Sequence, residues 1–442
     1  MLFTNAEALI ANGCTPQLRQ KRADALTICA AAIDAVDPYR VCKSILSSGR
    51  LTHETASLDF SSFSNIYLVA FGKASLGMAK AATEALPVRR GVVISPTPAL
   101  SSMKTVEVFV GGHPLPTQDS LQGTENALAL LRQVGAKDCV LVLISGGGSS
   151  LLEKPCIPLD DLRKLTEVLL ASGATIDELN IVRKHLSYVK GGQLIPLTKA
   201  TVVALIISDV VNDPFESIAS GPTAPDPSTF HDAVAVLKKY NISGRIPASV
   251  VEYLSRGLSG AVPETPKPSD PCFARVHNVL VANNTLACHA AATAATNLGY
   301  SSVVASTSVT GEARQVGQML VQKAKENPGC GIAVITGGET TVRVMGKGQG
   351  GRNQELVLGA IRELAGTEMV LASCATDGVD GRSPAAGAVA DGCSLSRASN
   401  ARLNPEEYLH RNDSYAFFSP LGDCLLSGPT GTNVMDLHIL LQ

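Results

Sequence analysis

The sequence predicts an α/β fold in two domains. Its 442 residues are too many for one ordinary hydrophobic core, so two domains are expected. Short apolar runs alternate with segments of helical periodicity, and glycine-rich turns follow several of the runs. This strand–turn–helix rhythm is typical of a mainly parallel sheet covered by helices. We therefore expect an N-terminal doubly wound, Rossmann-like parallel sheet and a smaller C-terminal α/β domain.

The apolar runs of the N-terminal half predict its strands. Residues 66–71 (IYLVAF) form a continuous apolar run, which marks a strand buried on both faces. After it, Ala74, Met78 and Ala81 recur at the spacing of a helix. Further strands are predicted at residues 91–95, 139–145 and 201–207. The last two lead directly into the turns SGGGSS and SDVVND.

A proline-rich segment separates the two halves of the chain. Residues 261–271 (AVPETPKPSDP) hold four prolines in 11 residues and no apolar pattern, as expected of a linker. Beyond it, strands are predicted at residues 278–283, 302–306, 331–336, 341–345 and 368–373, and helices at residues 285–298 and 353–365. We therefore place an N-terminal domain at residues 1–262 and a C-terminal domain at residues 272–442.

Composition and charge exclude several classes of protein. The net charge of −2 gives no overall field that would attract nucleic acid, and the absence of tryptophan argues against a surface that stacks bases. No apolar run reaches the roughly 18 residues that a membrane span needs. The N-terminus shows no secretion signal, and an organellar presequence is not favoured. We therefore expect a cytoplasmic protein that binds neither nucleic acid nor membranes.

The 11 cysteines are expected to be reduced. None of them forms a C-x-x-C pair, and several lie inside apolar runs, as Cys139 does. This pattern favours core thiols in a reducing compartment over disulfides or a zinc site.

Two glycine-rich turns predict a phosphate-binding site. In FGKAS, Lys73 lies between a buried strand and a helix, at the edge of an open α/β sheet where ligands bind. In SGGGSS, glycines expose backbone N–H groups and serines add hydroxyl donors. A solvated lysine and a turn without a ligand are the alternatives. The predicted phosphate-binding residues of the two turns are Gly72, Ser145, Gly146, Gly147, Gly148, Ser149 and Ser150.

The common nucleotide motifs are absent. Gly72 and Gly77 have the spacing of a P-loop, but Met78 stands where its lysine belongs, and no G-x-G-x-x-G follows a predicted strand. The chain is therefore neither a P-loop NTPase nor an ordinary NAD enzyme.

Carboxylates and an arginine follow other predicted strands. Asp209 and Asp213 come just after the strand at residues 201–207, where a carboxylate can hold Mg²⁺ or accept a hydroxyl proton. Turn formation is the alternative, above all for Asp213, which precedes a proline. In GKGQGGRNQE, Arg352 suits bidentate contact with phosphate from a glycine loop, and Lys347 is expected to assist.

The remaining candidates carry weaker signals. Asp377 and Asp380, in TDGVDG, lie in a turn that resembles a calcium or magnesium loop without the EF-hand spacing, and turn chemistry explains them equally well. Further candidates for substrate or metal binding, with helix capping as the alternative, are Asn412, Asp413, Asn433 and Asp436.

Four basic residues are assigned structural or solvent-exposed positions. His113 stands beside a proline and is interpreted as structural. Arg183, Lys184 and Lys190 are interpreted as a solvated helix face.

Taken together, these segments resemble the D-glycerate kinases of the glycerate 2-kinase type, whose C-terminal half is called the MOFRL domain. The resemblance rests on VAFGKASLGMA, LVLISGGGSSLL, LIISDVVNDPFESIASGPT, GQGGRNQELVL, ATDGVDG and GPTGTNVMDLH, in the family's order from about residue 66 to 438. It implies ATP-dependent phosphorylation of D-glycerate to 2- or 3-phosphoglycerate with Mg²⁺, in a cleft between the domains. It also implies catalytic roles for Lys73, Asp209 and Arg352.

Other functions remain open at this point. One is a nicotinamide-dependent hydroxypyruvate reductase, a name also used in this family, although no nicotinamide fingerprint is present. Another is a catalytically inactive sensor of nucleotides or sugar acids. The sequence leaves Asp209 as either a metal ligand or a general base, and it does not determine the oligomeric state, for which a homodimer is one option.

Overall fold

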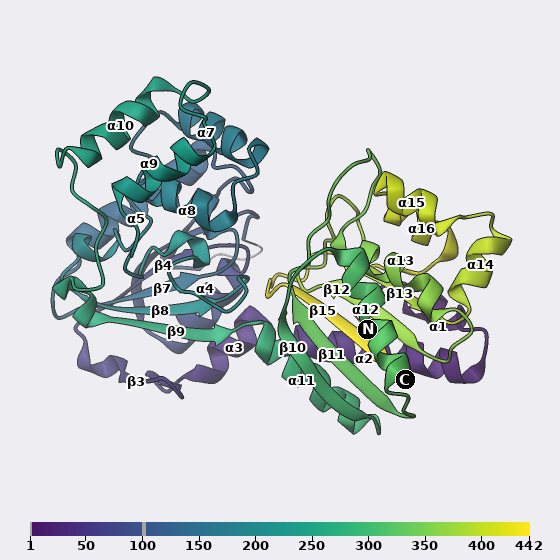
Figure 1. The fold of residues 1–442 in the computed structure, drawn as a ribbon. Helices are drawn as coiled ribbons and strands as arrows, with labels where there is room; N and C mark the ends of the chain where they lie inside the picture. Colours follow the sequence, from purple (N-terminus) through teal and green to yellow (C-terminus); the bar gives the residue numbers. More distant parts are fainter. Residues whose placement is uncertain (1, 100–102) are drawn as a thin grey trace. The chain divides into compact units, whose positions relative to one another are not determined.

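The computed structural model describes residues 2–99 and 103–442 and divides the chain into two compact units (Figure 1). Unit 1 combines Met1–Asp37 with Ala282–Gln442, and unit 2 is Pro38–Val281. This division differs from the predicted one, because the first 37 residues belong with the C-terminal half and the boundary lies after residue 281.

Unit 2 is built on a six-stranded sheet in the order β6-β5-β4-β7-β8-β9. The strands are β4 (Ile66–Phe71), β5 (Val88–Ser95), β6 (Val106–Val110), β7 (Cys139–Ile144), β8 (Thr201–Ile207) and β9 (Val276–Ala282). The pairs β5–β6, β4–β5, β4–β7 and β7–β8 are parallel. The chain winds outward from β4 in one direction and from β7 in the other, which confirms the doubly wound sheet.

Helices cover both faces of this sheet. The helices that contact the sheet strands are α4 (Ser75–Ala85) and α5 (Gln118–Gln133). The other helices of unit 2 are α3 (Pro38–Ile45), α6 (Gly148–Leu151), α7 (Leu159–Ala171), α8 (Ile176–Lys184), α9 (Phe230–Lys239) and α10 (Ala248–Leu258). A small antiparallel sheet consists of β1 (Leu46–Ser47), β2 (Arg50–His53) and β3 (Ala56–Asp59). Helices α7 to α10 share a separate apolar cluster that includes Leu165, Val182 and Phe230. In Figure 1 this helical group lies above the sheet.

The proline-rich segment is packed onto unit 2 and is not a free linker. Glu264 accepts hydrogen bonds from the backbone N–H of Phe230 and contacts His185, at 3.0 and 3.2 Å. Thr265 donates to the buried carboxylate of Asp226 at 2.9 Å. The chain then enters β9, the sixth strand of the unit 2 sheet. Proline spacing alone does not show these side-chain contacts, which is why the predicted boundary at residues 262–272 falls inside unit 2.

Unit 1 has a mixed sheet in the order β10-β11-β15-β12-β13-β14. The strands are β10 (Ser301–Val309), β11 (Ile332–Gly338), β12 (Val370–Ala375), β13 (Gly387–Asp391), β14 (Cys424–Leu425) and β15 (Asp436–Leu441). Only the β10–β11 pair is parallel among the described pairings of this sheet. The predicted strand at residues 341–345 is absent from the described structure, and Val344 and Met345 there are each 72% exposed.

Two layers of helices enclose the unit 1 sheet. The helices are α1 (Ala6–Ala11), α2 (Pro16–Ala35), α11 (Asn284–Asn297), α12 (Ala313–Glu326), α13 (Arg352–Leu364), α14 (Ser394–Asn400), α15 (Pro405–Arg411) and α16 (Ser414–Leu421). In Figure 1, α12 and α13 lie on one face, while α2 and α11 lie on the other. The N-terminal helix α2 thus completes the core of a unit whose sheet begins at residue 301.

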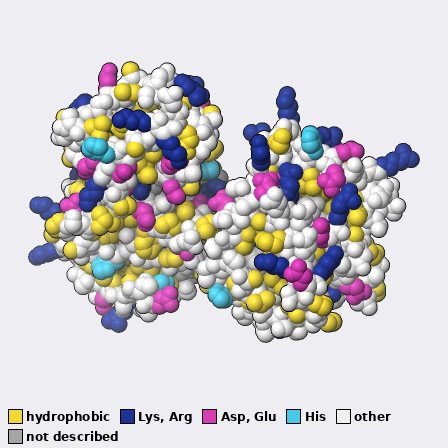
Figure 2. Space-filling model, viewed as in Figure 1, with side chains coloured by type: hydrophobic (Ala, Val, Ile, Leu, Met, Phe, Trp, Pro, Cys, Tyr) yellow, Lys and Arg dark blue, Asp and Glu magenta, His cyan; other side chains and the backbone are white. Residues whose placement is uncertain are grey.

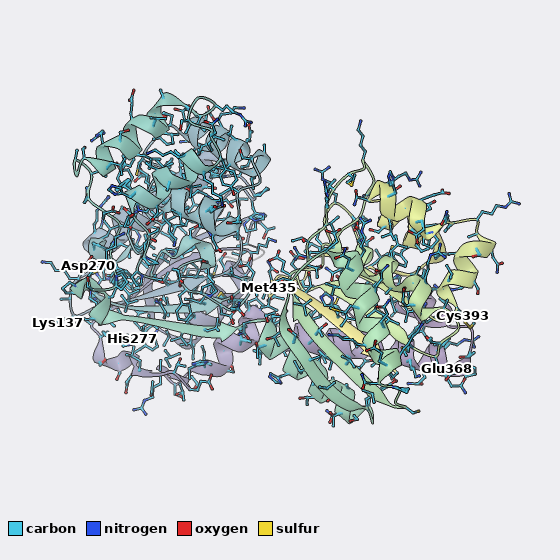
Figure 3. The ribbon with its side chains drawn as sticks, in the orientation of Figure 1. Lys137, Asp270, His277, Glu368, Cys393 and Met435 are labelled. Carbon is cyan, nitrogen blue, oxygen red and sulfur yellow. A yellow bond between two sulfur atoms is a disulfide. The ribbon has the colours of Figure 1, made fainter. Side chains whose placement is uncertain are left out.

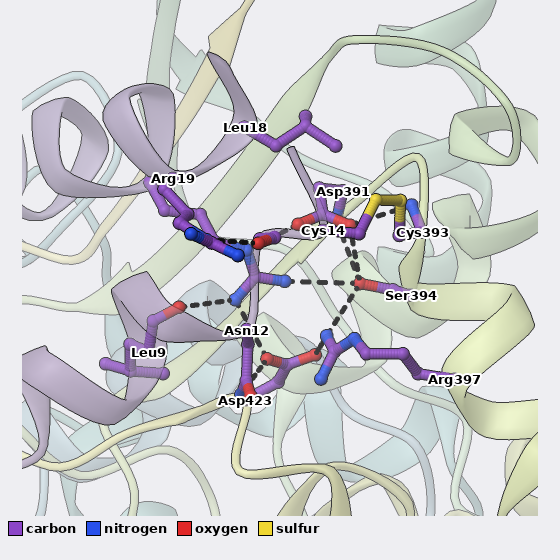
Figure 4. Close-up of polar contacts among 12 residues, drawn as sticks. Leu9, Asn12, Cys14, Leu18, Arg19, Asp391, Cys393, Ser394, Arg397 and Asp423 are labelled. Carbon is purple, nitrogen blue, oxygen red and sulfur yellow. Dashed lines mark hydrogen bonds and ion pairs between the residues drawn. A yellow bond between two sulfur atoms is a disulfide. The ribbon is translucent and has the colours of Figure 1, made fainter. Parts of the chain in front are cut away.

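Arg22 on α2 ties this N-terminal segment to the C-terminal half through Asp391 and Asp423, both of which Figure 4 labels. Its side chain is fully buried and forms ion pairs with Asp391 at 2.5 Å and Asp423 at 2.9 Å. It also donates to the carbonyl oxygen of Leu9 at 2.9 Å. Removal of this cation would leave the buried charge of Asp391 uncompensated, whereas Asp423 also pairs with Arg397.

A disulfide joins Cys14 to Cys393 beside this cluster (Figure 4). The expectation that every cysteine is reduced is therefore wrong for this pair, while the other nine cysteines form no disulfide within the described residues. The two residues are 379 positions apart in the chain, so their spacing carried no signal of the pairing.

The surface carries mixed charge. On the face shown in Figure 2, basic and acidic side chains are interspersed over both units, in line with the net charge of −2. Across the part of the chain that the structure describes, no helix combines the length and apolar character required to span a bilayer.

Arg22→Met should lower the free energy of unfolding by about 3–5 kcal/mol, because Asp391 would remain buried without its cation and Asp423 would keep only Arg397. Calorimetric melting measures this loss. Arg19→Met is the matched control, since Arg19 is an exposed arginine on the same helix. Equal melting temperatures for the two variants would contradict the assigned role of Arg22.

Candidate active site

Three predicted site segments meet at one edge of the unit 2 sheet. Phe71, Ile144 and Ile206 lie side by side on β4, β7 and β8. Adjacent strands are about 4.8 Å apart, so the turns that follow these residues emerge close together. Figure 3 labels Lys137 and His277 at the opposite, amino-terminal edge. The strand order reverses between β4 and β7, and in open α/β sheets ligands bind at that point.

The turn after β4 and the turn after β7 are in direct contact. The backbone N–H of Lys73 donates to the carbonyl oxygen of Gly146 at 2.8 Å, and that of Ala74 donates to Oγ of Ser145 at 3.0 Å. Gly72 has a φ of +119°, and a Cβ atom there would lie 2.2 Å from Oγ of Ser145. Glycine is therefore required at position 72 both by its backbone conformation and by space.

The turn after β7 leaves backbone donors available. Within residues 2–99 and 103–442, the N–H groups of Gly146, Gly147 and Ser149 meet no acceptor. Gly147 has a φ of +79°, which orients the turn between the strand and α6. Because α6 spans only four residues, any attraction for an anion comes from these N–H groups and from Lys73 rather than from a long helix.

Two basic side chains bind this turn from its buried side. The carbonyl oxygen of Ser149 accepts hydrogen bonds from Lys190 at 2.7 Å and from Arg183 at 3.1 Å. The hydroxyl of Ser149 is hydrogen-bonded to that of Ser220 at 2.8 Å, and Ser220 donates to Asn180 at 3.0 Å. The turn is therefore fixed from its buried side.

The expected solvated face of Arg183, Lys184 and Lys190 is wrong. Lys190 is 1% exposed and pairs with the buried Glu153 at 3.0 Å, while Lys184 pairs with Asp226 at 3.4 Å. Burial lowers the pKa of Lys190 to about 8, although Glu153 opposes this shift. The spacing of these charges in the sequence did not reveal their buried partners, because Glu153 and Asp226 come from distant segments of the chain.

Asp209 and Asp213 lie in the loop after β8, and both are half-buried. The loop has positive φ angles at the non-glycine residues Asn212, Asp213, Ala219 and Ser220. Such conformations cost free energy and persist only where surrounding contacts enforce them. The strain supports a functional loop, and the role of Asp209 as metal ligand or general base stays a prediction.

In unit 1, Arg352 is the first residue of α13 and is held by two carboxylates. It forms a two-pronged contact with the buried Asp436, at 2.5 and 3.1 Å, and a single contact with Glu339 at 2.6 Å. Burial acts to lower the pKa of Arg352, but the two carboxylates outweigh it and raise the pKa. Arg352 is therefore anchored at the start of a helix rather than carried by a mobile loop.

A buried polar network surrounds the start of α13. Asn353 donates to Asp436 at 2.9 Å and accepts from Ser373 at 2.6 Å. Asp380 accepts four hydrogen bonds from the backbone and side chains of Asn353 and Gln354. Burial raises the pKa of Asp380 to about 6 despite these bonds. Asp380 was expected in a possible cation loop, but it accepts these hydrogen bonds from the start of α13 instead. Sequence analysis missed Glu339 and Asn353, whose only signal was their position beside glycine turns.

Asn412 and Asp413 fasten the glycine loop that precedes Arg352. Asn412 accepts from the N–H groups of Met345 and Gly346 at 2.7 and 2.9 Å, and Asp413 accepts from that of Gln349 at 2.9 Å. These contacts are to the loop and are not helix caps, since Asp413 precedes α16 without a side-chain cap bond. The proposed roles of both residues in ligand binding stay predictions. Lys347 in the same loop is exposed.

Asp377 and Asn433 lie at the edge of the unit 1 sheet that also holds Asp436. Asp377 accepts from the N–H of Val379 at 3.1 Å, and Asn433 accepts from that of Met435 at 3.2 Å. Figure 3 labels Met435 at this edge, and Glu368 and Cys393 at the opposite one. Both contacts are local turn contacts, so roles in ligand binding stay predictions.

The structure groups no complete set of protein ligands for a metal. In the described ranges, no three His, Cys, Asp or Glu side chains are placed to hold an ion together. A magnesium ion commonly takes only one or two carboxylates and completes its shell with phosphates and water. Asp209 and Asp213 offer carboxylate oxygens of that kind.

Comparisons with known proteins agree with the fold. Residues 24–255 match the family described as a domain of unknown function, DUF4147, and residues 332–436 match the MOFRL family. The chain is 40% identical to the D-glycerate 2-kinase of Thermotoga maritima, over 94% of this chain and 97% of that protein. It is 39% identical to the glycerate 2-kinase of Pyrococcus horikoshii, over 93% and 94%.

Solved structures and other relatives add to this. The crystal structure of the Thermotoga maritima glycerate kinase matches with a TM-score of 0.83 at 40% identity, covering 95% of this chain and 98% of that one. A relative from Agrobacterium vitis, 38% identical over 85% of this chain and 86% of that protein, is named a putative hydroxypyruvate reductase.

Lys190→Met should lower the free energy of unfolding by about 3–5 kcal/mol, because Glu153 loses its closest cation and Ser149 loses a hydrogen-bond donor. Urea titration measures the change. Lys199→Met is the control, since Lys199 is exposed in the same unit. If both variants unfold at the same urea concentration, the buried cluster does not support the turn.

Proposed function

This chain belongs to the glycerate kinase family with a MOFRL domain, and we propose that it transfers the terminal phosphoryl group of ATP to a hydroxyl of D-glycerate. The enzyme is a kinase. The observation that carries the proposal is the pair of interlocked turns after β4 and β7. They place Lys73 beside backbone N–H groups that have no acceptor in the described chain.

The nucleotide phosphates are proposed to bind at these turns. The donors of Gly146, Gly147 and Ser149 supply partial positive charge in fixed positions, and Lys73 adds a full charge. Because the turn is held from behind by Lys190 and Arg183, little reorganisation is needed when an anion binds. Phosphoryl transfer depends mainly on such positioning and charge stabilisation.

Asp209 is proposed to serve the metal or the substrate hydroxyl. It follows β8 at the same strand edge as the turns, and its carboxylate oxygens suit Mg²⁺. Asp209, with Asp213 beside it, would hold the ion, and a bound ion neutralises phosphate charge. Alternatively, Asp209 accepts the proton of the glycerate hydroxyl as the new bond to phosphorus forms.

Arg352 is proposed to stabilise charge on the transferred group. Asp436 is fully buried and fixes one edge of the guanidinium. Glu339, which contacts the other edge, is 43% exposed, so that edge is the one accessible to a ligand. Lys73 and Arg352 belong to different units, so the proposal requires both units for one turnover.

Two other functions are distinguished by simple observations. The name of the Agrobacterium vitis relative keeps a nicotinamide-dependent hydroxypyruvate reductase under consideration. However, no G-x-G-x-x-G follows a strand in this chain. An inactive sensor would bind nucleotide or sugar acid without turnover. Consumption of NADH without ATP would support the first, and binding without product would support the second.

Purified protein with D-glycerate, ATP and Mg²⁺ should form ADP and a phosphoglycerate, and EDTA should stop the reaction because phosphate charge is no longer neutralised. ³¹P and ¹³C NMR of the product identify whether C2 or C3 carries the phosphoryl group. Turnover that continues in EDTA, or that needs NADH, would overturn the proposal.

Arg352→Ala should lower kcat by roughly 10³-fold with little change in ATP affinity, because its charge acts on the transition state. Arg352→Lys should restore part of the rate, since lysine lacks the planar fork. Steady-state kinetics and calorimetric ATP binding separate the two effects.

The control for the two Arg352 variants is Arg362→Ala, which removes an exposed arginine from the same helix. Arg352→Ala also leaves the buried Asp436 without its cation, so we expect lower stability and require folded protein at the assay temperature. A wild-type kcat in folded Arg352→Ala would contradict the role.

A further inference from the structure

His113, interpreted from sequence as structural, lies against the centre of the phosphate turn. A Cβ atom on Gly147 would lie 2.8 Å from Cδ2 and 3.2 Å from Nε2 of His113, and 3.4 Å from Cγ of Lys73. The imidazole and the lysine stem therefore flank the same glycine. The absence of a side chain at Gly147 is what lets both approach its backbone.

The loop that carries His113 must cross the sheet edge to reach this position. His113 follows β6, which is separated from β4 by β5. At the start of the loop, a Cβ atom on Gly111 would lie 3.2 Å from Cγ2 of Ile94 on β5 and 2.9 Å from Cδ2 of Leu151 on α6. The loop therefore packs against Ile94 on β5 and Leu151 on α6. Its imidazole lies near the point where the strand order reverses.

We infer that His113 is a second phosphate-contacting side chain of the nucleotide site, beside Lys73 and the backbone donors of the turn. His113 is exposed, so its imidazole remains accessible to a ligand. A protonated ring nitrogen donates to a phosphate oxygen, as the N–H groups of Gly146 and Gly147 do. An imidazole that only filled space against Gly147 would be replaceable by an apolar side chain of similar size.

The inference rests on the proposed function, and its test separates the two. His113→Leu keeps volume and removes both nitrogens, whereas His113→Gln retains an N–H donor near the position of Nε2. Titration calorimetry with ATP and Mg²⁺ measures affinity for both variants, and steady-state kinetics give KM for ATP and for D-glycerate. His231→Leu is the matched control, because His231 is an exposed histidine on α9 of the same unit.

His113→Leu should weaken ATP binding by roughly 10- to 100-fold, the usual effect of losing a hydrogen bond to a charged group. His113→Gln should recover a large part of the affinity, while KM for D-glycerate and the melting temperature stay near wild type. His231→Leu should bind ATP as the wild type does.

Three results would overturn the inference. One is unchanged ATP affinity in His113→Leu while Lys73→Ala loses it, which would leave the proposed function intact. A second is a selective rise in KM for D-glycerate, which would assign the imidazole to the substrate carboxylate. The third is wild-type protein that neither binds nor consumes ATP, which would reject the proposed function and this inference together.

Discussion

The contact between two backbone turns is the constraint on which the proposed site depends. Gly72 must approach Ser145 more closely than any residue with a Cβ could, and this approach lets the N–H of Lys73 bond to Gly146. The contact is possible because β4 and β7 are adjacent and parallel, with Phe71 and Ile144 in register. Sheet topology therefore determines where the lysine and the glycine turn meet.

Buried charge gives each unit its rigidity near the proposed catalytic groups. In unit 2, Lys190 and Glu153 form a pair under the glycine turn, and in unit 1 Asp436 fixes Arg352. Such pairs add little net stability compared with apolar packing, but the removal of one partner is costly. These ion pairs fix the positions of the groups they contact. A guanidinium or a backbone turn that is bound on one side keeps a fixed orientation towards a ligand on the other side.

Local signals predicted β4, β7, β8 and the doubly wound sheet, because periodicity and turn residues act over a few positions. They missed β6, β13 and β15 and wrongly placed a strand at residues 341–345. The sequence did not predict contacts between distant segments. Arg22 pairs with Asp391, and Lys190 donates to the carbonyl oxygen of Ser149. The loop after β6 brings His113 to Gly147. Each of these contacts depends on the topology of the fold. Proline content likewise suggested a linker where side-chain contacts in fact bind the segment to unit 2.

A crystal structure of the wild-type enzyme with Mg²⁺ and a non-hydrolysable ATP analogue tests the central claim most directly. We expect phosphate oxygens within about 3.2 Å of the backbone nitrogens of Gly146, Gly147 and Ser149 and of Nζ of Lys73. A nucleotide whose phosphates bind elsewhere, with these N–H groups facing only solvent, would contradict the account.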